Sequence, residues 1–384
     1  MKLLVCIYEY PPHYSSGAGN VAYYLVNQLK EMEVDCTVCS PIGGDVELCR
    51  RTWIERTHNY GIFDYFYRIL YFWHKAGQYV KENHSKYDIV WLHNPSPISF
   101  RTGLQKNLVT IHTTYYGYSL LEYPLLTHIY HKIMARFEKQ SLSSLGSMFS
   151  GVSQQVCHEL EKIGIERERI TYIPNGVDTG RFKPSANRKE LRKKFDLPED
   201  SIILLSLGKL TEQKQPDKLI EVFLLIEKNI KDVQLVIGGD GELLEKTKRL
   251  AQEKGLTRVK FLGYVDHKRE APDLYSCSDY YIITSKYEGQ PLTLFEAMAS
   301  GLPCIVSDIP ALRIVEKARC GIVADFNNIE TAASQIIKYL GGDNTNHSEN
   351  AREYAVSNLD WEIIAKGYLE EFRKLLQDRK TGER

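Results

Sequence analysis

Short apolar runs alternate with amphipathic helical segments along this chain, and that alternation restricts the fold more than any other feature of the sequence. The first apolar run, residues 2–10, ends at a pair of prolines, as a buried strand followed by a loop does. Residues 19–32 then place Val21, Leu25 and Leu29 on one face of a helix. Strands and helices that alternate in this way form a parallel sheet with helices on both faces. We therefore predict an α/β fold of the doubly wound type.

The alternation begins twice, which indicates two domains. We predict further strands in the first series at residues 34–41, 87–94, 108–115, 148–153 and 170–178, and in the second at 201–210, 233–241, 259–265, 278–285, 302–308 and 321–326. A polar stretch bracketed by Pro184 and Pro198 separates the two series. We place the N-terminal domain at residues 1–185, the C-terminal domain at 186–355 and a last helical segment at 356–384.

The composition argues against several classes of protein. The 49 Lys and Arg residues balance the 49 Asp and Glu residues, so the chain lacks the basic surplus of nucleic-acid-binding domains. The Cys-x-x-Cys pair Cys36 and Cys39 has no second pair to complete a metal site. Met1 leads directly into the first strand without a signal peptide, and no run reaches the ~18 apolar residues of a membrane span. We expect a cytoplasmic protein with reduced cysteines and no nucleic-acid partner.

One segment, residues 60–79, contains nine aromatic residues. A buried aromatic-rich helix is the interpretation that we favour. The alternative is a helix that faces an acceptor or a membrane, because Tyr and Trp are suited to interfaces, and Arg68 and Lys75 would then attract anionic lipid. In that case the protein would lie peripherally on the inner face of the membrane.

The segment at residues 285–303 predicts an anion-binding site. Gly289 gives a permissive loop after a strand, Pro291 suits the first position of a helix, and Gly301 suits its end. Backbone amides at the start of a helix bind anions. We expect this role for the four residues Gln290, Pro291, Leu292 and Thr293.

Two carboxylates accompany this anion site. Glu288 precedes the helix and Glu296 lies within it. A carboxylate repels phosphate, but it accepts hydrogen bonds from hydroxyl groups. The pair therefore indicates a ligand that contains both a diphosphate and a polyol.

These residues resemble the retaining nucleotide-sugar glycosyltransferases of family 4 (group 1). Glu288 and Glu296 are similar to the E-x7-E signature of that family, and residues 297–308 are similar to its usual continuation. The resemblance extends over nearly the whole chain and implies the GT-B fold, in which two Rossmann-like domains face each other across a cleft. It also implies that Glu288 binds hydroxyls of the donor sugar, that Glu296 binds the ribose, and that the last helix crosses back to the N-terminal domain.

The diphosphate contacts are implied by residues 206–223, which resemble a strand, loop and helix of the family. Lys214 matches the lysine that binds the diphosphate. Lys209 stands where the family has Arg, and an ammonium group cannot bind a diphosphate with the planar fork of a guanidinium. A catalytically silent homologue that binds sugar nucleotides is therefore an alternative.

The loop before the first helix has two interpretations. Gly17 and Gly19 fit a dinucleotide pattern, but about eight residues separate them from the first strand, and Asp35 is poorly placed to bind a ribose. We therefore disfavour a nicotinamide-dependent oxidoreductase. The loop resembles the first loop of the family, which implies that the backbone of the two glycines faces the donor phosphate.

Further contacts are implied at strand ends. His112 lies at the end of a predicted strand, where ligands of doubly wound sheets collect, and it resembles a histidine of the family's cleft. His93, which ends the preceding strand, is the second choice. Tyr264 and Val265 match the segment that cradles the donor base.

The resemblance implies transfer of a hexosyl unit from a nucleoside-diphosphate sugar to an acceptor hydroxyl with retention. It implies no cofactor, and cationic side chains in place of a metal. We favour a UDP-sugar donor, because His267 offers no carboxylate to a guanine; a GDP-mannose-dependent mannosyltransferase is the alternative. The acceptor is a sugar, a polyol or a lipid-linked glycan, and the lipid-linked one fits residues 60–79.

Overall fold

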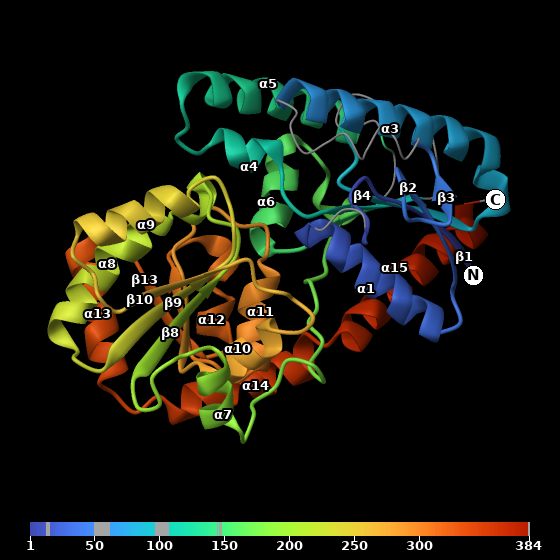
Figure 1. Ribbon diagram of the computed structural model, residues 1–384. Coiled ribbons are helices and arrows are strands. Elements are labelled where there is room, and N and C mark those ends of the chain that lie inside the picture. The colour runs from blue at the N-terminus through green and yellow to red at the C-terminus, as the bar shows by residue number, and fades with distance from the viewer. Residues whose placement is uncertain (13–15, 50–61, 97–106, 144, 146–147, 383–384) are drawn as a thin grey trace. The chain divides into compact units, whose positions relative to one another are not determined.

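The computed structural model describes residues 1–384 except 13–15, 50–61, 97–106, 144, 146–147 and 383–384, and it does not describe the side chains of 62–66 and 378–382. The contacts divide the chain into two compact units (Figure 1). Unit 1 contains residues 1–175 and 361–384, and unit 2 contains residues 176–360. The domain limits that the sequence predicts, after residues 185 and 355, stay predictions.

Unit 1 is built on a parallel sheet of seven strands in the order β3-β2-β1-β4-β5-β6-β7. The strands are β1 (Lys2–Cys6), β2 (Asp35–Ser40), β3 (Val46–Glu47), β4 (Ile89–His93), β5 (Asn107–Ile111), β6 (Met148–Gly151) and β7 (Ile170–Tyr172). All five residues of β4 and of β5 are buried, as expected for central strands that helices cover on both faces. The strand order reverses between β1 and β4, and ligands of doubly wound sheets bind at this point.

The helices of unit 1 join these strands. They are α1 (Gly17–Glu31), α3 (Ile62–Asn83), α4 (Tyr115–Ser119), α5 (Leu125–Ser143), α6 (Gln154–Ile163) and α15 (Trp361–Gly382), with short 3₁₀ turns at His84–Lys86 and Arg167–Arg169. Although α15 comes last in the chain, it packs within unit 1. The ring of Trp361 stacks on Tyr24 at 5.3 Å, and Tyr368 lies 4.8 Å from Trp91 of β4.

Unit 2 repeats the architecture with six parallel strands in the order β10-β9-β8-β11-β12-β13. They are β8 (Ile202–Leu207), β9 (Val233–Gly238), β10 (Val259–Gly263), β11 (Tyr280–Ile283), β12 (Cys304–Ser307) and β13 (Gly321–Ala324). The helices are α7 (Arg188–Lys194), α8 (Pro216–Asn229), α9 (Leu244–Glu253), α10 (Ala271–Cys277), α11 (Leu292–Ala299), α12 (Ile314–Lys317), α13 (Ile329–Leu340) and α14 (Thr345–Asn358), with 3₁₀ turns at Glu212–Lys214 and Pro310–Leu312.

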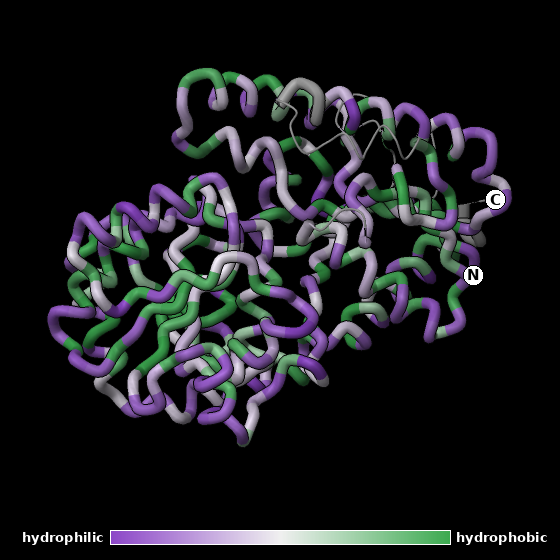
Figure 2. Tube along the Cα trace, in the orientation of Figure 1, coloured by the Kyte–Doolittle hydropathy of each residue, from purple (hydrophilic) through white to green (hydrophobic). Residues whose placement is uncertain are grey.

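Two hydrophobic cores lie on the two faces of this second sheet. Ile203 and Leu205 belong to one core and Leu204 to the other, because successive side chains of a strand point to opposite faces. Figure 2 shows apolar residues along the strands of this sheet. The predicted doubly wound fold is therefore confirmed for both halves of the chain.

A close backbone contact positions the loops that follow β8 and β9. Gly239 has φ of +131°, and a Cβ at this position would lie 1.9 Å from the carbonyl oxygen of Gly208. Only glycine fits such a contact. The loop that carries Lys209 is thereby held against the loop after β9.

Candidate functional site

Lys214 and Glu288 form an ion pair at the carboxyl-end edge of the sheet in unit 2. The strands β8 and β11 are neighbours at the point where the strand order reverses, so the loops that follow them meet there. Lys214 Nζ lies 2.5 Å from Glu288 Oε1. The same oxygen accepts a hydrogen bond of 2.6 Å from Ser285 Oγ. Glu288 is buried, and among the described residues its Oε2 has no hydrogen-bond partner.

The two loops are fastened to each other by hydrogen bonds. Thr284 Oγ1 donates to the carbonyl oxygen of Lys214 at 2.9 Å, and Gln213 Nε2 donates to the carbonyl oxygen of Tyr287 at 2.8 Å. Gln215, which follows Lys214, has φ of +47° and caps the N-terminus of α8. These bonds fix the backbone from which the Lys214 side chain projects.

Lys209 lies close to this pair. It lines the same small cavity, of about 30 Å³, as Lys214 and Ser285. Its side chain is exposed, and no hydrogen bond or ion pair joins it to the residues that the structure describes. An exposed ammonium group is therefore available beside the paired one.

Helix α11 begins beside Glu288. The predicted start is displaced slightly, because Pro291 lies just before the helix with ψ of 126°, and Leu292 is the first helical residue. Gln290 and Pro291 are buried, and Thr293 Oγ1 accepts a hydrogen bond of 2.7 Å from Tyr281. The first amides of a helix have no partner within it, so this terminus can bind an anion.

Glu296 is engaged by other side chains of unit 2. Its Oε1 lies 2.6 Å from His267 Nε2, and its Oε2 accepts a hydrogen bond of 3.1 Å from Tyr275. Arg181, which can only donate, lies 3.4 Å from His267 Nδ1, so His267 carries its proton on Nε2 and donates to Glu296. Burial and the neighbouring Glu296 raise the pKa of Tyr275 well above its usual range. No pattern in the sequence indicated these contacts of Glu296 with His267 and Tyr275.

The residues predicted to hold the base lie after β10. The Tyr264 side chain is 77% exposed, and Val265 packs beside Gly238. Among the described residues, no hydrogen bond or ion pair joins either residue to Lys214 or Glu288. The structure therefore places them at the same edge of the sheet, two strands from β8.

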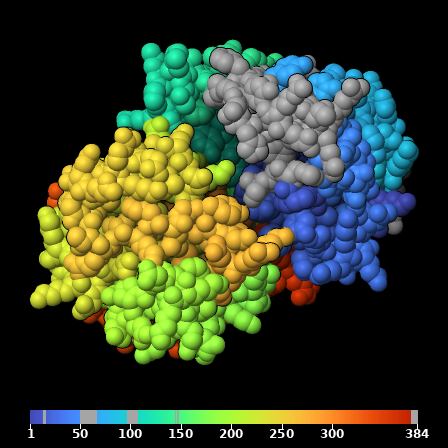
Figure 3. Space-filling model, in the orientation of Figure 1, coloured from blue at the N-terminus to red at the C-terminus, as the bar shows by residue number. Residues whose placement is uncertain are grey.

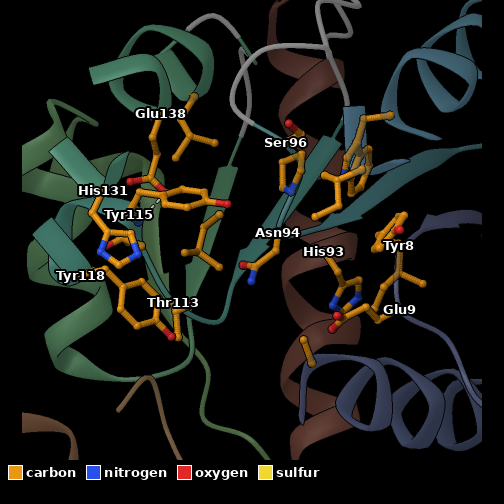
Figure 4. A pocket seen from close by; sticks show the side chains of 18 of the residues that line it. Tyr8, Glu9, His93, Asn94, Ser96, Thr113, Tyr115, Tyr118, His131 and Glu138 are labelled. Atoms are coloured by element: carbon orange, nitrogen blue, oxygen red, sulfur yellow. Dashed lines mark hydrogen bonds between the residues drawn. The ribbon is translucent and has the colours of Figure 1, made fainter. Parts of the chain in front are cut away.

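A second concave site lies within unit 1. It is a cavity of about 350 Å³ at the carboxyl ends of β1, β4 and β5 (Figure 4). Tyr8, Glu9 and His93 approach it from one side, and Tyr115, His131 and Glu138 from the other. This is the point where the strand order of unit 1 reverses.

His112 does not line this cavity directly, whereas His93 does. Their rings stack at 5.4 Å, with His93 Nδ1 lying 3.1 Å from His112 Nε2. Burial lowers the pKa of His112 to about 4, and burial and His112 hold the pKa of His93 well below its usual value. Both rings are therefore neutral near pH 7, and His93 is the one that faces the cavity.

Three polar atoms of the cavity wall are buried without a hydrogen-bond partner in the described part of the chain: His93 Nε2, Ser96 Oγ and His131 Nδ1. Buried polar atoms are nearly always hydrogen-bonded in native proteins. Their convergence on one cavity indicates a polar ligand.

Glu138 is the carboxyl group of α5 at this cavity. It accepts hydrogen bonds from the backbone amides of Tyr115 and Tyr116 at 3.1 and 3.0 Å. Burial raises the pKa of Glu138 to about 8, although the two amides oppose that rise. The group is largely protonated near pH 7, so Glu138 adds no full negative charge to the cavity wall.

The remaining predicted site residues lie on α1 and α3. Gly17 and Gly19 form the first turn of α1, where the Ser16 side chain accepts from the Gly19 amide at 3.0 Å. Of residues 60–79, positions 60–61 and the side chains of 62–66 lie outside the described part. Farther along α3, Phe72 and Trp73 are fully buried, whereas Tyr67 is exposed.

The described residues contain neither a metal-binding cluster nor a membrane-spanning helix. No group of three or more His, Cys, Asp or Glu side chains there is arranged to hold a metal ion. No helix within the same residues is long and apolar enough to cross a membrane.

Comparison with known proteins gives two family matches that follow each other along the chain. The family "Glycosyl transferases group 1" matches residues 187–357, and the family "Glycosyltransferase Family 4" matches residues 15–181. Among solved structures, a sucrose-phosphate synthase from Thermosynechococcus elongatus superimposes with a TM-score of 0.81 and 19% identity, covering 98% of this chain and 100% of that one.

Two curated relatives share part of the sequence. A UDP-Gal:alpha-D-GlcNAc-diphosphoundecaprenol alpha-1,3-galactosyltransferase from Escherichia coli is 31% identical over 189 residues, which are 48% of this chain and 48% of that protein. A GDP-mannose-dependent alpha-(1-6)-phosphatidylinositol monomannoside mannosyltransferase from Mycobacterium tuberculosis is 29% identical over 208 residues, 51% of this chain and 54% of that protein. The chain thus spans about half the length of the curated relatives that it matches.

Proposed function

The chain belongs to the group 1 glycosyltransferases of family 4, which have the GT-B fold, and we propose that it transfers a hexosyl unit from a nucleoside-diphosphate sugar to an acceptor hydroxyl with retention of configuration. The observation that carries the proposal is the pair of Lys214 and Glu288 beside the start of α11. This edge of unit 2 combines cations and helix amides for a diphosphate with a buried carboxylate for sugar hydroxyls.

The donor diphosphate takes the place beside Lys209, Lys214 and the first amides of α11. Negative charge develops on the diphosphate as the bond to the sugar breaks, and preorganised cations and amides stabilise that charge most. The side chains of Lys209 and Lys214 then supply the positive charge that a metal ion supplies in other transferases. We propose that the transfer requires no metal.

The sugar is held by Glu288. Lys214 and Ser285 occupy Oε1, which orients the carboxylate and leaves Oε2 to accept from donor hydroxyls. Glu296 is proposed to bind the ribose, in which case a ribose hydroxyl competes with His267 or Tyr275 for its oxygens.

We propose uracil as the base. Guanine presents N–H donors that a carboxylate binds well. Position 267 carries His instead, and its ring is already engaged by Glu296. The exposed ring of Tyr264 is proposed to lie against the base, and Val265 beside it.

The cavity of unit 1 is the proposed acceptor site. Aromatic rings of Trp73, Tyr115 and Tyr118 and unpartnered polar atoms suit a sugar, which has an apolar face and many hydroxyls. The leaving phosphate takes the acceptor proton, so the His93 and His112 pair orients the acceptor and need not act as a base. The two curated relatives are named for lipid-linked acceptors, which supports a lipid-linked sugar here, met at the cytoplasmic face of a membrane.

The test is binding followed by product analysis. UDP is expected to raise the melting temperature, because a ligand that binds only the folded state stabilises it, whereas GDP is expected to have little effect. A shift with GDP alone would make the protein GDP-mannose-dependent.

¹H NMR of the product should show the same anomeric configuration as the donor sugar, and inversion would contradict the mechanism. EDTA should leave the rate of transfer unchanged, and a loss of rate in EDTA would contradict the absence of a metal.

A further inference from the structure

One side of helix α5 exposes large apolar side chains. Leu126 is 82% exposed, and the other members of the row are each at least 41% exposed. The row consists of Leu125, Leu126, Ile129, Ile133 and Phe137. Residues three and four positions apart lie on the same side of a helix, so these side chains form one continuous strip.

Cations follow the edge of this strip. Lys132, Arg136 and Lys139 are exposed on α5. The acidic residue of the helix, Glu138, is buried and faces the cavity of unit 1. Glu122, in the loop before α5, is exposed and is the nearest acidic residue along the chain outside the helix. The outer face of α5 therefore combines apolar and positively charged side chains without an acid of its own.

We propose that α5 lies in the surface of an anionic lipid membrane. An apolar strip bordered by Lys and Arg is the pattern of helices that rest in the interface, with the apolar side chains at the acyl boundary and the cations at the phosphates. Figures 1 and 3 show α5 (teal) on the outside of unit 1. Charge complementarity selects an anionic lipid surface as the occupant over a neutral one.

The opposite side of α5 connects this surface with the cavity. Tyr130, His131, Glu138 and Leu142 line the cavity from within the helix. A membrane that binds the outer face thus lies one helix away from the pocket. The link between the membrane and the cavity rests on the proposed function, because it places a lipid-linked sugar within reach of the acceptor site.

The surface differs from residues 60–79, for which membrane contact was the alternative interpretation of the sequence. Arg68, expected to attract lipid from residues 60–79, is buried, and the described aromatic residues Phe72 and Trp73 face the core. Tyr67 and Tyr71 of α3 remain exposed and can extend the surface. The main contact is assigned to α5.

Sedimentation with lipid vesicles tests the inference. The full chain is expected to pellet with vesicles of equimolar phosphatidylcholine and phosphatidylglycerol, to stay in solution with phosphatidylcholine alone, and to be released by salt. Leu126→Ser with Ile133→Ser should lower the partition coefficient about ten-fold or more. Lys132→Gln should lower it about five-fold.

Val356→Ser, on α14 of unit 2, is the matched control, because it also replaces an exposed apolar residue. Its binding should equal that of the wild type. If the wild type stays in solution with both vesicles, or if the double variant pellets as the wild type does, the inference is wrong. Self-association that the double variant abolishes would show that a second copy covers the strip. Vesicle binding needs no sugar nucleotide, so its failure is distinct from failure of the proposed transfer.

Discussion

At the scale of single residues, Lys214 and Glu288 are the most direct test of the donor site. Lys214→Ala should lower kcat about 100-fold or more, because a cation aimed at the leaving group is lost. Glu288→Gln keeps the shape of the side chain and should lower turnover similarly. Steady-state release of the nucleoside diphosphate measures both, and circular dichroism checks the fold.

Lys246→Ala is the control for these variants. Lys246 is exposed on α9 and takes part in no ion pair among the described residues, so its loss should leave kcat unchanged. If Lys214→Ala turned over as fast as Lys246→Ala, the assignment of Lys214 would be wrong.

Glu138 gives a prediction on pH. The folded state holds the proton of Glu138 up to about pH 8, whereas the unfolded chain releases it near pH 4.5. The folded state then binds more protons in this range, so the free energy of unfolding falls as pH rises, by about 5 kcal/mol over the whole range. The stabilisation is fully present below about pH 4.5 and is lost as pH rises through about 8.

Glu138→Gln should remove that pH dependence. Gln still accepts one of the two backbone amides, so a loss that is constant with pH is expected in addition. Urea unfolding of both proteins across the pH range measures the difference, which should shrink as pH rises. An unchanged difference would show that Glu138 is ionised in the folded state.

The sequence indicated which residue types gather at the donor site, but it did not indicate all of their partners. Glu288 was predicted from the loop before a helix and Lys209 and Lys214 from the family resemblance, and the structure brings the three to one edge of the sheet. Glu138 was missed, since a lone acid in a helix normally faces solvent. Its signal was that the rest of residues 125–143 contain no acid.

At the scale of elements, the first turn of α1 distinguishes two glycines that the sequence treated alike. A Cβ on Gly19 would lie 2.3 Å from the carbonyl oxygen of Glu9, whereas a Cβ on Gly17 would meet nothing within 4 Å. Gly19→Ala should lower the free energy of unfolding by about 2 kcal/mol, because the backbone must move. Gly17→Ala should raise it by about 0.5 kcal/mol.

Thermal or urea unfolding of the two variants provides the comparison. Equal stability of the two variants would show that the backbone of Glu9 and α1 can move apart without lowering the free energy of unfolding. Loss of UDP binding in Gly17→Ala alone would instead support the predicted phosphate contact at that glycine.

The strands of three residues or more were predictable as elements, whereas the two-residue strand β3 was not. Each predicted strand overlaps an observed one, because a run of apolar residues marks a strand that is buried on both faces. Strand β3 has only two residues, Val46 and Glu47, and is defined by pairing with β2 rather than by composition. Two residues are too few for an apolar run or an alternating pattern to mark a strand.

At the scale of the whole molecule, the two units make different predictions for fragments. Unit 2 is continuous in sequence and contains both of its hydrophobic cores, so residues 176–360 should fold alone. Unit 1 is completed by α15, whose Tyr368 and Phe372 pack on Trp91. Residues 1–175 alone should therefore lack a cooperative unfolding transition.

Differential scanning calorimetry of the two fragments measures this difference. A cooperative transition in residues 1–175 would show that α15 contributes little to unit 1. The absence of one in residues 176–360 would show that unit 2 depends on the rest of the chain.

The central claim is that this chain uses Lys214 and Glu288 to break a nucleoside-diphosphate sugar. The most direct measurement is the release of nucleoside diphosphate from a panel of UDP-hexoses and GDP-mannose by the full chain, beside the variants at these two positions and Lys246→Ala. We predict release from a UDP-hexose by the wild type and the control, with a fall of about 100-fold in the other two. Release from no donor, or equal release by all four proteins, would contradict the account.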